Sequence, residues 1–181
     1  MERCRMVFSG SGGQGVITAA IILAEAAVLH EGLEAVQSQA YGAEARGGAT
    51  RSDVVISDAT INFPKVIQPN VLVCLTQASY NKFSPIIRPG GMLITDSRYV
   101  TIQKKVDARQ FELPMHRSVM DKIGKPIVLN ICMLGAVLRL TDLVRAESVM
   151  NVLKRRIPSG FLQINQQALD LGMELAGEHG V

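Results

Sequence analysis

Residues 5–30 read RMVFSGSGGQGVITAAIILAEAAVLH, and this stretch decides the fold class. It predicts a short buried strand over Arg5–Ser9, a glycine-rich loop, and a helix over Gln14–His30 that Gly32 ends as a left-handed cap. Glu34–Gln39 predicts a second strand, so the chain begins with a strand–helix–strand unit whose crossover we expect to be right-handed. Such a unit is typical of an α/β domain.

The rest of the chain alternates strands with turns and then becomes helical. The predicted strands are Ser52–Ser57 in a hairpin with Thr60–Asn62, Val71–Leu75, Met92–Thr95 and β-like pieces up to Pro114. The predicted helices are Gln77–Phe83, Met115–Ile123, Ile127–Leu140, Ala146–Lys154 (capped by Thr141 or Asp142) and Leu162–Ala176. Residues 1–181 therefore predict a single α/β domain, a Rossmann-like three-layer sandwich. Its central sheet is mostly parallel, helices cover both faces, and the C-terminal third is helical.

Composition excludes several classes of protein. Apolar residues make up 48% of the chain and tryptophan is absent, so we expect a folded domain with an aliphatic core. The net charge is only +3, without aromatic residues among the basic ones, which argues against a nucleic-acid partner. The longest apolar stretch, Val16–Leu29, contains Glu25 and is too short to span a membrane. No membrane partner is expected.

The cysteines indicate a reducing compartment. Cys4, Cys74 and Cys132 are odd in number and lie tens of residues apart, which fits neither a disulfide framework nor a metal cluster. Cys74 and Cys132 stand in apolar runs and are predicted to be small buried hydrophobic residues. Since the N-terminus also lacks a signal-peptide pattern, we expect a cytoplasmic protein.

The loop Gly10-Ser11-Gly12-Gly13-Gln14-Gly15 matches the G-x-G-x-x-G pattern between a strand and a helix. Glycines allow a ligand to approach the backbone closely, and the amides at a helix N-terminus favour a phosphate or carboxylate. The side chains of Ser11 and Gln14 are further candidate donors. The alternative is a tight turn that only lets the helix pack against the strand.

A dinucleotide site would place an acidic residue about 20 residues after these glycines, on the ribose hydroxyl. The second predicted strand instead ends Val36-Gln37-Ser38-Gln39. No lysine followed by serine or threonine closes the first loop, which excludes a kinase-type phosphate loop. A free-standing nucleotide- or flavin-binding module therefore remains only as an alternative hypothesis.

A second unusual loop follows the second strand and reads Tyr41-Gly42-Ala43-Glu44-Ala45-Arg46-Gly47-Gly48. Loops after neighbouring strands of an α/β sheet converge at the carboxyl edge, where ligands bind. Arg46, with Arg51 as a second candidate, could then reach an anion held by the first loop. A structural Glu44–Arg46 pair or packing at a subunit contact explains the same residues. The candidate binding residues of this region are Tyr41, Glu44, Arg46, Gly47, Gly48 and Arg51.

The sequence offers no catalytic constellation. The histidines are His30, His116 and His179, and none stands in the spacing of a triad or a metal site. There is no G-x-S-x-G motif and no paired cysteine. This indicates a ligand-binding or scaffolding subunit without a catalytic residue or metal of its own.

Together the two loops resemble the paired signatures of the gamma subunit of 2-oxoacid:ferredoxin oxidoreductases. The resemblance continues in residues 54–58, 89–91 and 130–135, and ends in residues 165–172, which are similar to the family's N-x-x-A-x-x-x-G. It covers nearly the whole chain. The segment Phe63-Pro64-Lys65-Val66-Ile67 is most similar to the 2-oxoglutarate type, while the pyruvate, branched-chain and indolepyruvate types share the two loops. Val55 and Asn70 depart from the arginine and aspartate expected at those positions.

The resemblance implies a subunit of an enzyme that oxidatively decarboxylates a 2-oxoacid to an acyl-coenzyme A and reduces ferredoxin. Such a complex uses thiamine diphosphate, Mg²⁺, iron–sulfur clusters and coenzyme A. The alpha and beta subunits, with a ferredoxin-like delta subunit, would carry the thiamine diphosphate and the clusters. This chain would be inactive alone and would self-associate when isolated. The sequence leaves open which 2-oxoacid is the substrate and what the stoichiometry of the complex is. It also leaves open whether Gly10–Gly15 contacts coenzyme A or only a partner subunit.

Overall fold

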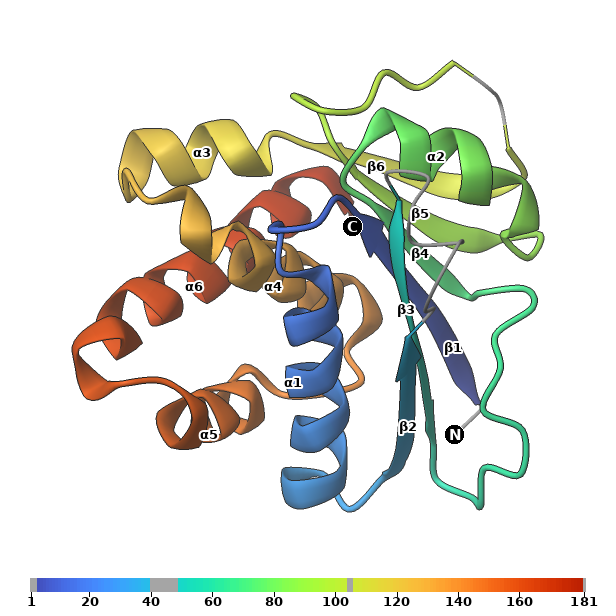
Figure 1. Cartoon of the computed structure of the whole chain (residues 1–181), viewed down its shortest axis with the longest axis horizontal. Coiled ribbons are helices and arrows are strands. Elements are labelled where there is room, and N and C mark those ends of the chain that lie inside the picture. The colour runs from blue at the N-terminus through green and yellow to red at the C-terminus, as the bar shows by residue number, and fades with distance from the viewer. Residues whose placement is uncertain (1–2, 40–48, 104–105, 181) are drawn as a thin grey trace.

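The computed structural model describes residues 3–39, 49–103 and 106–180, which form a six-stranded sheet with helices on both faces (Figure 1). The strands are β1 (Cys4–Gly10), β2 (Glu34–Gln39), β3 (Thr50–Ser57), β4 (Val71–Cys74), β5 (Gly91–Asp96) and β6 (Ala108–Leu113). The helices are α1 (Val16–His30), α2 (Gln77–Phe83), α3 (Met115–Lys122), α4 (Leu129–Thr141), α5 (Ala146–Arg156) and α6 (Leu162–Gly180). Short 3-10 turns, η2 (Ser84–Ile86), η3 (Pro126–Val128) and η4 (Ser159–Phe161), connect some of them.

The sheet has the order β2-β3-β1-β4-β5-β6 and is mostly parallel, as predicted. The pairs β1–β4, β4–β5 and β5–β6 are parallel, whereas β3 runs antiparallel to both β1 and β2. The predicted hairpin of Ser52–Ser57 with Thr60–Asn62 is wrong, because Thr60–Asn62 forms no strand. The run Val54-Val55-Ile56 is buried on both sides, which places β3 inside the sheet rather than in an exposed hairpin.

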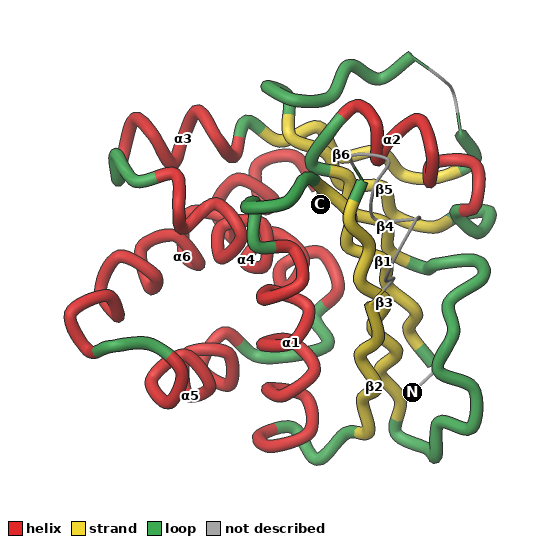
Figure 2. The backbone as a smooth tube through the Cα atoms, viewed as in Figure 1, coloured by secondary structure: helices red, strands yellow, loops and turns green. Residues whose placement is uncertain are grey.

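Helices cover the two faces unequally (Figure 2). Met6 and Phe8 of β1 point toward α1 and the C-terminal helices, while Val7 points to the smaller core beneath α2. This alternation is that of a strand with both faces buried, and it creates the predicted three layers. The helical C-terminal third is confirmed. No helix in the described ranges is long and apolar enough to cross a membrane.

Helix ends explain one correct prediction and one error. Gly32, at φ +66°, ends α1 as predicted, and Leu33 N donates to Ala27 O at 3.1 Å. Asp142 does not cap α5 but ends α4 in the left-handed conformation, and Thr141 Oγ1 donates back to Val137 O. A carboxylate remote in sequence instead accepts the hydrogen bonds at the N-terminus of α5. That carboxylate, on Glu31, accepts hydrogen bonds from Arg145 N at 2.9 Å and Ser148 Oγ at 2.5 Å.

The cysteines are free thiols. Cys74 lies in the core beneath α2 and Cys132 in the core on the opposite face, both fully buried as predicted. Burial raises the pKa of each of these two thiols to about 12, so both are neutral at physiological pH. They act as packing residues.

Helices α4 and α6 pack against each other at two glycines. A β-carbon on Gly172 would lie 1.8 Å from Cys132 O, and one on Gly135 would lie 2.1 Å from Leu169 O. No side chain fits at these distances, so backbone touches backbone at both points.

We predict that Gly172→Ala lowers the free energy of unfolding by at least about 2 kcal/mol, because the added methyl group forces the two helices apart. Gly177→Ala is the matched control in the same helix, since its β-carbon would meet only Arg139 Nε at 3.4 Å. It should stabilise the helix by about 0.5–1 kcal/mol. Chemical denaturation of both variants measures the difference, and equal stabilities would contradict this packing.

Candidate functional site

The loop Gly10–Gly15 lies at the carboxyl end of β1 and leads into α1 (Figure 2). Gly13 has φ +90° and Gly15, the residue before the helix, has φ +72°. Residues other than glycine rarely adopt these positive φ values. The sequence expectation of a strand, a glycine loop and a helix is therefore met, with the helix beginning at Val16.

The side chain of Gln14 shapes the loop from inside. Its Oε1 accepts a hydrogen bond from Ser11 N at 2.8 Å, and its Nε2 donates to Leu75 O, just beyond β4, at 3.1 Å. Gln14 was proposed as a donor to a ligand, but its amide binds within the chain. The Gln14 side chain thus links the loop after β1 to the carboxyl end of β4.

The glycines of the loop fall into two kinds. A β-carbon on Gly10 would lie 2.5 Å from Gln14 Oε1, and one on Gly15 would lie 2.6 Å from Asn130 Nδ2. Gly10 and Gly15 are therefore needed for packing. Around Gly12 and Gly13 no atom lies within 4 Å of the added β-carbon, and both residues are exposed. These two form the open tip of the loop, where a ligand or partner could approach.

Asn130 supports the loop from below and was not among the predicted site residues. Its Nδ2 donates to Gly15 O at 3.3 Å, although the two residues are 115 positions apart. Asn130 is the second residue of α4 and is followed by a run of buried apolar residues up to Leu138, and this polar side chain beside the apolar run is the signal that could have identified it. The entry into α1 is thus fixed by the C-terminal helices as well as by the sheet.

The loop has the capacity to bind an anion. Within the described part of the chain, the amides of Gly12, Gly13, Val16 and Ile17 donate no hydrogen bond. The amides of Val16 and Ile17 stand at the positive end of the α1 dipole. An oxyanion at the loop tip would meet free N–H groups, which is the chemistry expected from the sequence.

The structure does not describe the second predicted loop, residues 41–48. Tyr41, Glu44, Arg46, Gly47 and Gly48 lie outside the described residues. After them, Thr50 pairs with Gly10 in the β1–β3 ladder, and Thr50 Oγ1 donates to Gly10 O at 2.9 Å. The start of β3 therefore lies directly beside the first loop.

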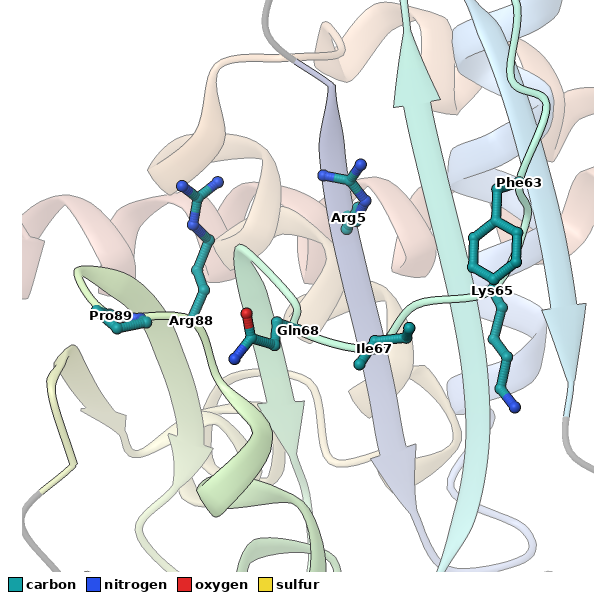
Figure 3. A pocket seen from close by; sticks show the side chains of 7 residues that line it. All are labelled: Arg5, Phe63, Lys65, Ile67, Gln68, Arg88 and Pro89. Carbon is teal, nitrogen blue, oxygen red and sulfur yellow. The ribbon is translucent and has the colours of Figure 1, made fainter.

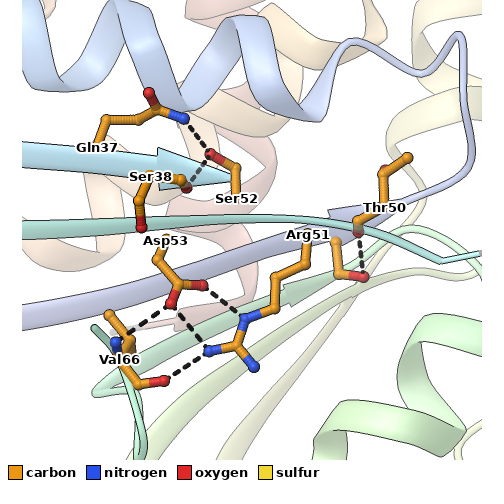
Figure 4. Close-up of polar contacts among 8 residues, drawn as sticks. Gln37, Ser38, Thr50, Arg51, Ser52, Asp53 and Val66 are labelled. Carbon is orange, nitrogen blue, oxygen red and sulfur yellow. Dashed lines mark hydrogen bonds and ion pairs between the residues drawn. The ribbon is translucent and has the colours of Figure 1, made fainter. Parts of the chain in front are cut away.

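Arg51 points away from the loop (Figure 4). Its guanidinium binds the Asp53 carboxylate through Nε at 2.6 Å and Nη2 at 3.0 Å, and it donates to Val66 O at 2.6 Å. Its Cζ lies 5.3 Å from the centre of the Phe83 ring, beneath α2. The geometry thus assigns Arg51 to organising residues 58–70 rather than to an anion at Gly10–Gly15.

The most buried carboxylate at the carboxyl edge is Asp96, which sequence reasoning missed. It ends β5, and its oxygens accept hydrogen bonds from Arg98 N at 2.9 Å and His116 N at 2.7 Å. Burial raises the pKa of Asp96, against the lowering effect of these two bonds. Because both oxygens bind backbone amides, Asp96 serves as a cap for α3.

The histidines show no catalytic arrangement. His116 packs its ring edge-on against Tyr99 at 5.2 Å, and His30 ends α1. The side chain of His179 lies outside the described part. Among residues 3–39, 49–103 and 106–178, no group of three or more His, Cys, Asp or Glu side chains could hold a metal ion.

The chain is similar to subunits of known oxidoreductases. It is 46% identical over 172 residues to the 2-oxoglutarate synthase subunit KorC of Methanocaldococcus jannaschii, covering 94% of this chain and 92% of that protein. It is 32% identical over 155 residues to the common gamma subunit of the pyruvate and ketoisovalerate oxidoreductases of Thermococcus litoralis, covering 81% and 83%.

Solved structures agree. The gamma subunit of a keto/oxoacid ferredoxin oxidoreductase from Geobacter sulfurreducens superimposes with a TM-score of 0.88 and 38% identity, covering 97% of this chain and 99% of that one. A 2-oxoglutarate:ferredoxin oxidoreductase from Magnetococcus marinus, with 2-oxoglutarate, coenzyme A and succinyl-CoA bound, shares the fold at a TM-score of 0.86 and 21% identity. The match covers 98% of this chain and 32% of that one. The family model described as pyruvate ferredoxin/flavodoxin oxidoreductase matches residues 5–175. This chain therefore belongs to the pyruvate ferredoxin/flavodoxin oxidoreductase family.

Proposed function

We propose that this chain is the gamma-type subunit of a cytoplasmic 2-oxoacid:ferredoxin oxidoreductase of the 2-oxoglutarate type. The observation that carries the proposal is the 46% identity, over nearly the full length of both chains, to a 2-oxoglutarate synthase subunit. The complex would oxidatively decarboxylate 2-oxoglutarate, transfer the acyl group to coenzyme A and reduce ferredoxin. Alpha and beta subunits, with a ferredoxin-like delta subunit, are its partners.

In this proposal the chain binds a ligand or a partner subunit, and it carries none of the groups that perform the chemical steps. In such a complex, thiamine diphosphate with Mg²⁺ supplies the decarboxylation chemistry and iron–sulfur clusters carry the electrons. Neither group fits the described residues. No three His, Cys, Asp or Glu side chains gather there to hold Mg²⁺. Cys74 and Cys132, which a cluster would need, are buried on opposite faces with pKa values of about 12. Cys4 stands apart on β1. We therefore place both groups on the partner subunits.

The glycine loop is proposed to hold a phosphate of coenzyme A. Support comes from the exposed tip at Gly12 and Gly13, the free amides that follow, and the rigid base formed by Gln14 and Asn130. Its role would be to neutralise and orient the anion through backbone N–H groups, which need no titratable side chain. Coenzyme A is bound in the related Magnetococcus enzyme.

A second candidate role is a purely structural interface. Ile127 is 79% exposed and Phe161 50% exposed, and both line an apolar pocket that also includes Asn130, the residue beneath the glycine loop. Large exposed apolar side chains next to a loop favour contact with another chain. Under this role the loop docks on a partner and holds no ligand.

The end of β2 does not support the alternative of a nucleotide- or flavin-binding module. There Gln37 Nε2 donates to Ser52 Oγ, which in turn donates to Ser38 O (Figure 4). Neutral side chains occupy the position where a ribose-binding acid would stand.

We predict that the purified chain shows no oxidation of 2-oxoglutarate with coenzyme A and a viologen dye, because it lacks the groups that perform the chemistry. Activity should appear only when alpha and beta subunits are added. Turnover by the isolated chain would overturn the proposal. Micromolar binding of NAD, FAD or ATP to the isolated chain would favour the nucleotide-binding module.

We predict that Gly12→Val raises the KM for coenzyme A at least about tenfold in the assembled complex, because its side chain fills the open loop tip. Gly13→Val should act likewise, with added strain at its positive φ. Gly32→Ala is the control, since it introduces strain at φ +66° in open space away from the loop. An unchanged KM with intact assembly would refute coenzyme A contact, and loss of assembly would favour the interface role.

A further inference from the structure

A pocket of about 730 Å³ lies at the amino ends of the strands, the sheet edge opposite to the glycine loop (Figure 3). Arg5 reaches it from β1 and Arg88 from the turn before β5. The segment before β4 contributes Phe63, Lys65, Ile67 and Gln68. Ligands of α/β proteins normally bind at the carboxyl edge. This pocket therefore has no part in the proposed coenzyme A site and calls for a separate explanation.

The pocket is strongly basic. Arg5, Lys65 and Arg88 line it, and no aspartate or glutamate is among its lining residues. Within the described residues, the guanidinium of Arg5 and the ammonium of Lys65 make no hydrogen bond or ion pair. The unpaired charges of Arg5 and Lys65 beside one hollow produce a positive potential that attracts an acidic partner.

The same hollow exposes large apolar side chains. Phe63 is 55% exposed and Ile67 is 65% exposed. Aromatic residues and arginines are enriched at protein interfaces and often supply most of the binding energy there. A pocket for a small polar anion would have no need of either exposed side chain.

The segment that carries these residues is held rigidly although it has no regular secondary structure. Val66 is buried, its N–H donates to Asp53 Oδ2 at 3.2 Å, and its carbonyl accepts from Arg51 Nη2 at 2.6 Å (Figure 4). Its neighbours Lys65 and Ile67 are both exposed. The Arg51–Asp53 ion pair thus fixes the segment with these two side chains facing out, which reduces the entropy lost on binding.

We propose that Arg5, Phe63, Lys65, Ile67 and Arg88 form a basic docking surface for an acidic segment of another subunit of the oxidoreductase. The inference rests on the proposed function, which supplies the partner. The cations come from three separate segments: Arg5 from β1, Lys65 from the segment that Arg51 and Asp53 of β3 hold, and Arg88 from the turn before β5 (Figure 3). Cations so spread, with apolar side chains between them, match a peptide that carries several carboxylates around an apolar residue. A second copy of this chain would bring the same positive charges together.

The test uses the whole complex, produced by co-expression of this chain with its alpha, beta and delta partners. Lys65→Glu and Phe63→Ser are the variants, since both side chains are exposed and neither change should disturb folding. Arg117→Glu is the matched control, because its side chain is 83% exposed on α3, outside the docking surface. Assembly is measured by mass photometry over a dilution series, with circular dichroism to confirm folding.

We expect Lys65→Glu and Phe63→Ser each to raise the dissociation constant of the complex at least about tenfold, and Arg117→Glu to leave it unchanged. Added salt should weaken the wild-type complex more than the Lys65→Glu complex. A photo-crosslinking residue placed at position 63 should link to a partner segment rich in Asp and Glu.

Wild-type affinity in both variants, or a cross-link to a segment without acidic residues, would overturn the docking surface while leaving the proposed function intact. Micromolar binding of tripolyphosphate to the wild type, lost in Lys65→Glu without any change in assembly, would replace it with a small-anion site. If the wild-type chain does not assemble with the oxidoreductase subunits at all, the proposed function fails, and the docking inference fails with it.

Discussion

Strand β3 runs antiparallel between β1 and β2, and the register of this one strand positions both candidate surfaces. Thr50 lies opposite Gly10 and its hydroxyl donates to the Gly10 carbonyl, which places the start of β3 beside the glycine loop. One residue further on, Arg51 points to the opposite face and, with Asp53, holds Val66 in place. Side chains alternate along a strand, so Thr50 contacts the glycine loop while Arg51 holds the segment that lines the basic pocket.

The described glycines have different structural roles, which the residue type alone does not distinguish. Gly10 and Gly15 make room for the side chains of Gln14 and Asn130, whereas Gly12 and Gly13 leave the loop tip open. Gly172 allows one helix backbone to touch another. Of the four glycines in the first loop, Gly12 and Gly13 are the two that a ligand could approach, so a substitution in that loop affects either folding or binding according to its position.

Two polar side chains that the sequence suggests as ligand contacts, those of Gln14 and Arg51, make hydrogen bonds within the chain. The Gln14 amide fastens the loop to the end of β4, and the Arg51 guanidinium fastens the segment before β4. Asp96 accepts two backbone N–H groups at the start of α3 and beyond β5. Among the described residues, the glycine loop at one sheet edge keeps backbone N–H groups without an acceptor, and Arg5 and Lys65 at the other edge keep side chains without a partner.

The sequence by itself determined the α/β class, the strand–loop–helix at Gly10–Gly15, the aliphatic core and most helix positions. These follow from local periodicity and glycine placement, which depend on residues near one another in the chain. Only the tertiary structure decided that β3 lies inside the sheet, that Arg51 faces Asp53, and that Asn130 supports Gly15 from 115 positions away. It also brought Arg5 and Lys65 to one pocket. Strand order and contacts between distant segments are set by packing of the whole core, and no local pattern in the sequence encodes them.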